Sequence, residues 1–463
     1  MSEAPAMTAT SKNPWAWIPT LYFAEGIPYV MVMTVSVIMY KRLGISNTDI
    51  ALYTSWLYLP WVIKPLWSPV VDLMGTKRFW TVLMQGVIGA VLAMVALSIP
   101  APRFFQYTIA FFWLMAFSSA THDIAADGFY MLGLEQHQQA AFVGVRSTFY
   151  RIAMIAGEGA LVVLAGILEK RLGQLRIAWE ITLFVTAAVF LGAFVYHLVV
   201  LPRPAADVWR SGGKRQALVG EFLKVFADFF RKDQIGVILA FLLMYRVAEA
   251  QLVKLVYPFL LDARSDGGLG LDTSQVGLIK GTIGVVALLG GGILGGVAIS
   301  RHGLRFWLWP MVFIMHLPDL AFVYLAYAQP SSYLPISAAV AVEQFGYGFG
   351  FTAYMLYMIM VAEGAHKTAH YAICTGIMAL GMMLPGMFSG WLQDHVGYRH
   401  FFLWVLISTI PGFIVAALVK IAPEFGRKTA AGSELPVISH GEPQAEEGLS
   451  AGDATSRPGE LLD

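Results

Sequence analysis

Residues 104–132 read FFQYTIAFFWLMAFSSATHDIAADGFYML, a stretch in which one histidine and two aspartates interrupt an otherwise apolar run. The hydrocarbon core of a bilayer is about 30 Å thick, and a helix needs about 20 apolar residues to cross it. This stretch is long enough for such a crossing. Ionisable residues inside a membrane helix are costly unless they have a partner or a function. The sequence therefore predicts a membrane-spanning helix that carries a functional site.

Eleven further stretches of this kind accompany the first one. With residues 104–132, the expected spans cover residues 15–40, 48–71, 79–99, 139–168, 177–201, 234–260, 273–299, 306–328, 333–361, 369–392 and 399–421. The whole chain of 463 residues is 57% hydrophobic and only 13% charged, with a mean hydropathy of +0.64. Soluble domains contain about 25% charged residues. The composition is that of a protein that crosses the membrane many times.

The spacing of the spans predicts an all-α membrane protein with twelve transmembrane helices in two six-helix bundles. The expected parts are a cytoplasmic N-terminal segment (1–14), an N-terminal bundle (15–201), a cytoplasmic linker with an amphipathic helix (202–233), a C-terminal bundle (234–421) and a disordered cytoplasmic tail (422–463). The tail is rich in Gly, Pro, Ser, Ala and Glu, a composition typical of disorder.

The distribution of charge predicts the orientation of the chain. The 31 basic and 30 acidic residues nearly cancel, so net charge indicates no nucleic-acid partner. Cytoplasmic loops of membrane proteins are enriched in Lys and Arg. The linker is the most basic segment, with Arg203, Arg210, Lys214, Arg215, Lys224, Arg231 and Lys232. An even number of spans then places both termini in the cytoplasm.

The two halves of the chain repeat each other at an offset of 224 residues. Ala24-Glu25 falls on Ala248-Glu249, Tyr130-Met131-Leu132 falls on Tyr354-Met355-Leu356, and Gly157 falls on Gly381. Single matches of this kind arise by chance in apolar sequence, but several at one offset indicate two bundles with a common plan. Parallel six-span halves with a site at their interface are the plan of the major facilitator superfamily.

The two aspartates of the fourth span are the first candidates for a proton site. Asp123 and Asp127 are four residues apart, which places both carboxylates on one helix face with His122 beside them. Two carboxylates in a poorly solvated interior repel each other, so one of them is expected to bind and release a proton near neutral pH. A structural ion pair with a cation remains the alternative. We assign proton coupling to Asp123 and Asp127.

Other buried charges are expected to surround this pair. Lys64, Arg151, Glu25 and Glu158 lie inside spans of the first half and are expected to form a charge network with the aspartates. His122 and the second-half residues Arg246, Glu249, Tyr347 and Tyr354 are expected to line the substrate cavity. The two tyrosines suit either stacking on a substrate or packing between helices.

A short loop after the second span suggests a conformational latch. It contains Asp72, Gly75, Lys77 and Arg78, a shortened form of the loop signature of the major facilitator superfamily. A carboxylate at a helix end beside basic residues can form ion pairs that exist in only one of two conformations. The alternative is an ordinary charge at a helix end.

Several motifs resemble those of the AmpG-type muropeptide permeases, relatives of the acetyl-coenzyme A transporters within the same superfamily. They are Phe23-Ala-Glu25-Gly-Ile-Pro28, Lys64-Pro-Leu-Trp-Ser-Pro-Val-Val-Asp72, Phe117-Ser-Ser-Ala-Thr-His122-Asp123-Ile-Ala-Ala-Asp127 and Tyr150-Arg151. The resemblance implies proton-driven import of N-acetylglucosaminyl-anhydro-muropeptides. It also places the family's helix-four aspartates on Asp123 and Asp127, its buried lysine on Lys64 and its arginine on Arg151.

The leading hypothesis is therefore a proton-coupled secondary transporter of the bacterial inner membrane that imports a cell-wall sugar, a muropeptide or a related small solute by alternating access. It is expected to be monomeric, to use protons as coupling ion and to need no cofactor or metal. An exporter of drugs or metabolites and a non-transporting sensor are alternatives. An intramembrane enzyme is a weaker one, because the sequence has no HExxH metal motif and no GxSxG nucleophile motif.

Overall fold

The computed structural model describes residues 13–209, 215–364 and 366–427, and every regular element in these ranges is helical. The first half contains η1 (Pro14–Ala16), α1 (Ile18–Val30), η2 (Met31–Val35), α2 (Ser36–Arg42), α3 (Asn47–Trp56), α4 (Leu59–Leu73), α5 (Lys77–Ser98), α6 (Phe104–Gly133), α7 (Gln136–Met154), η3 (Ile155–Leu161), α8 (Val162–Leu172) and α9 (Leu175–Val200). The expected disordered tail from residue 428 onward lies outside the described residues.

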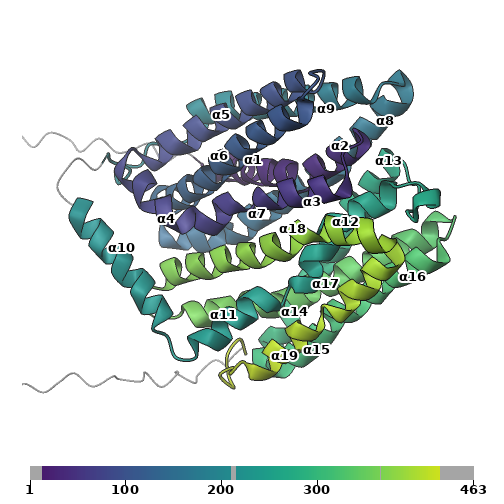
Figure 1. Ribbon diagram of the computed structural model, residues 1–463. Coiled ribbons are helices and arrows are strands. Elements are labelled where there is room, and N and C mark those ends of the chain that lie inside the picture. Colours follow the sequence, from purple (N-terminus) through teal and green to yellow (C-terminus); the bar gives the residue numbers. More distant parts are fainter. Residues whose placement is uncertain (1–12, 210–214, 365, 428–463) are drawn as a thin grey trace, which may run out of the picture. The chain divides into compact units, whose positions relative to one another are not determined.

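The linker and the second half continue in the same way. Their elements are α10 (Arg215–Phe230), α11 (Ile235–Met244), α12 (Val247–Leu261), η4 (Arg264–Asp266), α13 (Thr273–Val276), η5 (Gly277–Gly284), α14 (Val285–His302), α15 (Leu304–His316), η6 (Leu317–Asp319), α16 (Leu320–Ala328), α17 (Tyr333–Ala362), α18 (Lys367–Ile407) and α19 (Ile410–Leu418). In Figure 1, α10 lies across the ends of other helices, where the expected linker helix would be.

Within the described residues, ten helical stretches are long and apolar enough to cross a membrane, against twelve expected from the sequence. The expected span 48–71 is divided between α3 and α4, because Pro60 lies in the first turn of α4, where its missing N–H does no harm. The last two expected spans form one stretch, Ala369–Leu418, which is broken at Gly397 by a left-handed φ of 72°.

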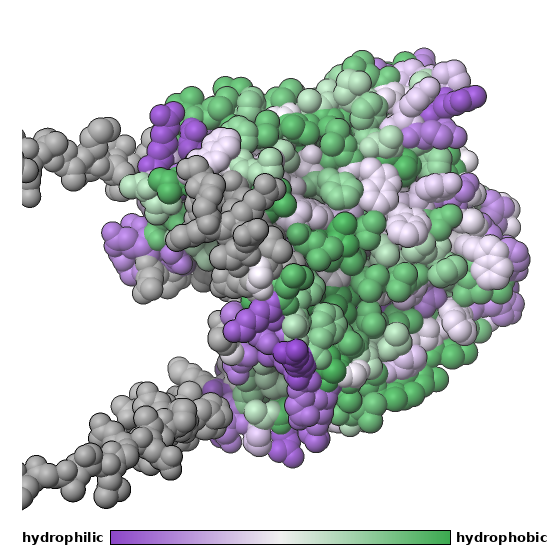
Figure 2. Space-filling model, turned by 60° about the vertical axis from the view of Figure 1, so that its left-hand side comes forward, coloured by the Kyte–Doolittle hydropathy of each residue, from purple (hydrophilic) through white to green (hydrophobic). Residues whose placement is uncertain are grey.

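The surface of the described chain is that of a membrane protein. Figure 2 shows apolar residues over the middle of the molecule and hydrophilic residues gathered toward its two ends. Large apolar side chains point outward, among them Val199, Ile293 and Phe388, which are 65–70% exposed. Exposed apolar area of this extent suits contact with lipid tails and would be unfavourable in water. The protein therefore crosses the membrane several times.

Helices of the first half pack mainly on one another, as do those of the second. In the first half, α5 packs between α6 and α9, and α1 packs on α7; in the second, α17 packs on α14 and α15. Several contacts join the halves: α18 packs on α3 and α4, α12 on α2 and α3, η3 on η5, and α8 on α13 and η5. In Figure 1, α18 and α12 lie beside α3 accordingly.

Glycines allow the closest of these crossings. A Cβ added to Gly166 of α8 would lie 2.3 Å from the backbone nitrogen of Ser274 in α13. A Cβ added to Gly281 of η5 would lie 2.0 Å from the carbonyl oxygen of Glu158 in η3. These distances are far below a van der Waals contact, so a larger residue would force the helices apart. Small residues at helix crossings are the usual means of close packing in membranes.

The expected seventh span, 234–260, is a broken helix. α11 ends at Met244 and α12 begins at Val247, with Tyr245 and Arg246 between them. The Tyr354 hydroxyl of α17 donates a hydrogen bond of 2.6 Å to the carbonyl oxygen of Leu242. In a continuous helix this carbonyl would accept from the N–H of Arg246. A hydrogen bond from a neighbouring helix thus satisfies a backbone group at the break.

Candidate functional site

A cavity of about 960 Å³ lies between the two halves of the chain. First-half elements contribute Tyr29, Trp61, Lys64, Asp127 and Glu158 to its lining, and second-half elements contribute Arg246, Glu249, Tyr257, Lys280 and Tyr347. Its lining extends to residues at one set of helix ends: Gly75, Leu132, Asp207 and Tyr371. We call this end the mouth. The connections at the opposite end, which we call the closed face, contribute no lining residue among those described.

Asp127 of α6 lines the cavity and is paired with an arginine. Its Oδ1 accepts a hydrogen bond of 2.7 Å from Nη2 of Arg146 in α7 and one of 3.4 Å from the Tyr22 hydroxyl in α1. The guanidinium carbon of Arg146 lies 4.5 Å from the centre of the Tyr22 ring and 5.1 Å from that of Tyr130. Arg146 is thus held by a carboxylate and two aromatic rings.

Asp123 lies one turn earlier on α6 and has a different partner. Its Oδ2 accepts 3.1 Å from Nε1 of Trp61 and 3.5 Å from Nζ of Lys64, both in α4. The pairing of Lys64 with an aspartate of the fourth span follows the sequence analysis. Because each aspartate faces a different cation on a different helix, the two carboxylates form two neighbouring ion pairs rather than one shared site.

The expected single charge network is divided in the structure. Arg151 is an exposed residue of α7, has no ion pair within 4 Å among the described residues and is not in the cavity lining. Arg146, which the sequence analysis did not assign, forms the ion pair with a helix-four aspartate that was expected of Arg151. The reason is helical periodicity, because Arg146 and Arg151 are five residues apart and project from different sides of α7. Glu25 is 8% exposed and its Oε2 has no hydrogen-bond partner.

Glu158 joins the two halves at the cavity. Its Oε1 accepts 3.1 Å from the Thr34 hydroxyl of η2, and its Oε2 accepts 3.0 Å from the Tyr257 hydroxyl of α12. Glu158 and Thr34 lie in π-helical segments, as does Lys280 in η5. Such segments are rare and occur often at functional sites. Nothing in the hydropathy of the sequence signals them.

The second half contributes its own buried charges. Lys280 lies 3.3 Å from Oε2 of Glu343 in α17, and the Gln344 amide donates to both oxygens of the same carboxylate, at 3.0 and 2.9 Å. Arg246 donates to the Tyr347 hydroxyl and lies 4.6 Å from the centre of the Phe351 ring. Glu249 is 3% exposed, and its Oε1 has no partner.

Two residues expected in the cavity lie elsewhere. His122 is buried away from it and is 2.9 Å from the Gln85 amide of α5, which in turn contacts His197 of α9 at 2.8 Å. Spacing on α6 explains this result, because residues 122 and 123 are 100° apart on a helix, so that His122 faces α5 whereas Asp123 faces α4. Tyr354 is also absent from the lining and holds the break of the seventh span instead.

The latch segment lies at the mouth of the cavity. The Asp72 side chain lies outside the described residues, whereas Gly75 and Lys77 line the cavity. The N–H groups of Lys77 and Arg78 donate to the Asp207 carboxylate at 2.7 and 2.9 Å. Asp207 comes from the linker and caps the N-terminus of α5 from outside that helix. The sequence analysis did not identify this contact, because it joins residues 130 positions apart.

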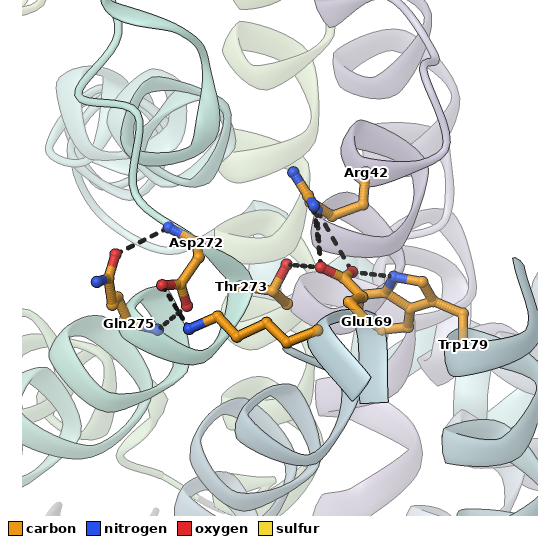
Figure 3. A network of polar contacts seen from close by, with 7 residues as sticks. Arg42, Glu169, Trp179, Asp272, Thr273 and Gln275 are labelled. Atoms are coloured by element: carbon orange, nitrogen blue, oxygen red, sulfur yellow. Dashed lines mark hydrogen bonds and ion pairs between the residues drawn. The ribbon is translucent and has the colours of Figure 1, made fainter. Parts of the chain in front are cut away.

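At the closed face, a polar cluster joins the halves (Figure 3). Glu169 of α8 accepts from Nη2 of Arg42 at 3.0 Å, from Nε1 of Trp179 at 2.9 Å and from the Thr273 hydroxyl at 2.7 Å. Beside it, Lys170 forms an ion pair of 2.8 Å with Asp272. We call Arg42, Glu169, Lys170, Asp272 and Thr273 the Glu169 cluster. It fastens α8 to α13, an element of the other half.

A second polar contact closes the same face between α2, α3 and the second half. Nζ of Lys41 lies 2.6 Å from Oδ1 of Asp262, and the Tyr398 hydroxyl donates to Oδ2 of the same carboxylate at 2.6 Å. Asn47 donates 2.6 Å to Oε1 of Gln393. The cavity is therefore continuous with one end of the molecule, while polar contacts between the halves close the other end.

Comparison with known proteins shows which family and which relatives the chain resembles. The model of the BT1 family matches residues 25–325. The anhydromuropeptide permease of Escherichia coli is 24% identical over 419 residues, 88% of this chain and 80% of that protein. A transporter of Rickettsia conorii named AmpG 4 is 26% identical over 411 residues, 85% and 94% of the two chains. The resemblance to AmpG-type permeases seen in the motifs is thereby confirmed.

The fold has solved counterparts. A mutant form of the nucleoside transporter NupG superposes with a TM-score of 0.67 at 16% sequence identity, covering 88% of this chain and all of that one. At this identity the match speaks for the fold alone. The all-helical architecture predicted from the sequence is shared with a membrane transporter of known structure.

Proposed function

The chain belongs to the BT1 family, and we propose that it is a secondary transporter that imports a cell-wall-derived sugar, a muropeptide or a related small solute with protons. The similarity to permeases and transporters over most of the chain supports transport rather than catalysis. The observation that carries the proposal is the cavity between the halves, which reaches one face and is closed at the other. A binding site that is accessible from one side at a time is what alternating access requires.

We propose that the helices make twelve crossings in two bundles. The stretch Ala369–Leu418 has 50 residues, or about 75 Å of helix, which is far more than one crossing of about 30 Å needs. The break at Gly397 divides it into two pieces of sufficient length. α3 and α4 together supply the remaining crossing.

The orientation follows from the linker. The mouth of the cavity includes linker residue Asp207, and the linker is the most basic segment of the chain. The positive-inside rule assigns this side to the cytoplasm of a bacterial inner membrane, with both termini on the same side. The structure then represents an inward-facing state in which the Glu169 cluster closes the periplasmic side.

Asp123 and Asp127 are the proposed proton-coupling residues. Each forms an ion pair inside a span, with Lys64 and Arg146 respectively. Protonation of either carboxylate would leave its cation without a counter-charge, and a buried charge without a partner is costly. The helices that carry the cations, α4 and α7, would then be free to move relative to α6. Proton binding can in this way alter the packing of the first half.

The test is uptake into proteoliposomes of the disaccharide N-acetylglucosaminyl-1,6-anhydro-N-acetylmuramic acid, with and without an inward proton gradient. The wild-type protein should accumulate the solute only with the gradient. Asp123→Asn and Asp127→Asn should lose accumulation yet retain exchange of solute at equal pH. Asp266→Asn, at an exposed position on the closed face, is the matched control. Accumulation unchanged in both asparagine variants would refute the assigned roles.

A further inference from the structure

Arg246 and Glu249 differ from the other buried charges of the cavity. Lys64, Asp127 and Lys280 each have an oppositely charged partner, and Glu158 accepts two hydroxyl hydrogen bonds. Arg246 is 6% exposed and Glu249 is 3% exposed, yet neither has an ion pair within 4 Å among the described residues. Nε of Arg246 and Oε1 of Glu249 have no hydrogen-bond partner. Buried polar atoms in this state are costly, and a ligand can remove the cost.

The position of Arg246 favours an anion. Arg246 is the residue directly before α12, and its side chain makes no capping hydrogen bond to that helix. The N-terminus of a helix carries a partial positive charge, and interrupted membrane helices present this end to anionic groups of substrates. The guanidinium and the helix end therefore attract the same kind of group. Both lie at the cavity, which is lined by Arg246 and Glu249.

The surroundings of Arg246 hold its plane in place. The Tyr347 hydroxyl accepts from Nη2, and the rings of Phe351 and Tyr347 lie 4.6 and 5.3 Å from the guanidinium carbon. These contacts occupy one nitrogen and leave Nε without a partner. A planar guanidinium held in this way suits a planar carboxylate, which it can bind through two parallel hydrogen bonds.

Glu249 restricts the ligand further. It lies three residues after Arg246, in the first turn of α12, and both residues line the cavity. When ionised, Glu249 disfavours a dianion such as a phosphate monoester close to Arg246. Its unpartnered oxygen instead accepts from an O–H or N–H donor. Lys280 is not available to Glu249 as a partner in this state, because it is paired with Glu343.

We propose that Arg246 and Glu249 form a specificity site that binds a carboxylate and an adjacent hydrogen-bond donor of the transported solute. Arg246 binds the carboxylate, and Glu249 accepts from the donor. This inference rests on the proposed transport function and adds to it a chemical requirement, because a neutral sugar would leave the guanidinium unsatisfied. In this proposal, residues of the second half of the chain select the solute.

The site can be tested with a matched pair of solutes, the disaccharide named above and the methyl ester of its single carboxylate. The wild-type protein should take up the acid with an apparent affinity about tenfold or more higher than that of the ester, the range expected for a charge-assisted hydrogen bond. Arg246→Gln should remove this preference, and Arg246→Lys should restore part of it. Arg305→Gln, an exposed arginine at the start of α15, should retain the preference. Equal affinities for acid and ester in the wild type would overturn the proposal.

A second measurement separates this site from the proposed function. The thermal unfolding of purified protein is followed with N-acetylmuramate, which has a carboxylate, and with N-acetylglucosamine, which has none. Stabilisation by N-acetylmuramate in the wild type and Arg305→Gln, absent in Arg246→Gln, supports the site even if no muropeptide is transported. Equal stabilisation of Arg246→Gln and the wild type by N-acetylmuramate, or none in the wild type, contradicts it.

Discussion

Replacing Gly166 by alanine should shift the protein away from the conformation seen here. The added Cβ would lie 2.3 Å from both the backbone nitrogen and the hydroxyl oxygen of Ser274. The serine hydroxyl can rotate, but the backbone nitrogen cannot move without α13. To restore a contact of 3.4 Å, α8 and α13 must separate by about 1.1 Å, directly beside the Glu169 cluster.

The magnitude follows from the cost of overpacking, which is about 1–3 kcal/mol for an extra methyl group in a close-packed contact. If the closed face opens in the alternative state, the cost applies to the present state alone. The ratio of the two states then changes by about 5- to 150-fold. A preference of about 99:1 would fall to between about 95:5 and about 40:60.

The assay is a distance measurement between spin labels on the closed face. Gln174 and Ser265 are exposed, belong to different halves and can be replaced by cysteine in a Cys374→Ala background, because Cys374 is the single cysteine of the chain. Gly166→Ala should increase the population with the longer distance. Gly192→Ala in α9 is the control, since its Cβ would meet nothing within 4 Å. Identical distance distributions for the two alanine variants would refute the reasoning.

Two further predictions follow from named contacts. Tyr354→Phe removes the hydroxyl that binds the Leu242 carbonyl oxygen, so the midpoint of thermal unfolding in detergent should fall by an amount equivalent to about 1–2 kcal/mol, whereas Tyr327→Phe, an exposed tyrosine, should leave it unchanged. Burial acts to raise the pKa of the Asp272 carboxyl, but hydrogen bonds from Lys170 and from backbone N–H groups lower it below its usual value. A lowered pKa in the folded state means that the stabilisation is present above the ordinary aspartate pKa of about 3.9 and is lost as the pH falls through the lowered value. The spin-label distance at the closed face should therefore stay constant between pH 8 and pH 5 and should change in the wild type below pH 4. A change of the same size in Asp272→Asn protein below pH 4 would contradict this assignment.

The sequence was a good guide to the fold because the membrane imposes a simple rule. Every span must be apolar and about 20 residues long, so hydropathy alone located the helices. It was less informative where helices break inside the membrane. Tyr245 and Arg246 interrupt a span that contains no glycine or proline at that point, and the carbonyl group of Leu242 beside the break accepts a hydrogen bond from Tyr354, more than 100 residues away.

The candidate site, too, was predicted from the sequence only in part. The choice of Asp123, Asp127 and Lys64 came from single-span reasoning and from family motifs, and the structure pairs Asp123 with Lys64 but Asp127 with Arg146. The exchange of Arg151 for Arg146 depends on how α7 is rotated about its axis, which neither composition nor spacing fixes. Thr34, Tyr257 and Asp207 were missed because hydroxyls and linker carboxylates are common, and only the packing of distant segments gives them a role.

The equivalence of the halves extends to the contacts of their polar residues. Tyr22 and Arg246 occupy matching positions at the offset of 224, as do Asp127 and Phe351. In each half, a residue of the first expected span contacts a residue of the fourth. Tyr22 donates to Asp127, and the guanidinium of Arg246 lies over the ring of Phe351. At these matching positions, one half has a hydroxyl–carboxylate contact and the other half has a contact between a guanidinium and an aromatic ring.

For the import proposed above, Asp207 has a consequence for solutes that leave the cavity through its mouth. Its two bonds to α5 hold the segment Ala206–Val208 against the pore wall, so departing molecules pass a piece of chain that belongs to neither helical half. The width of this exit and the strength of binding deeper inside are therefore set by different residues. Bulkier side chains at Ala206 would slow release while leaving affinity unaltered, which makes turnover and recognition separable properties of this protein.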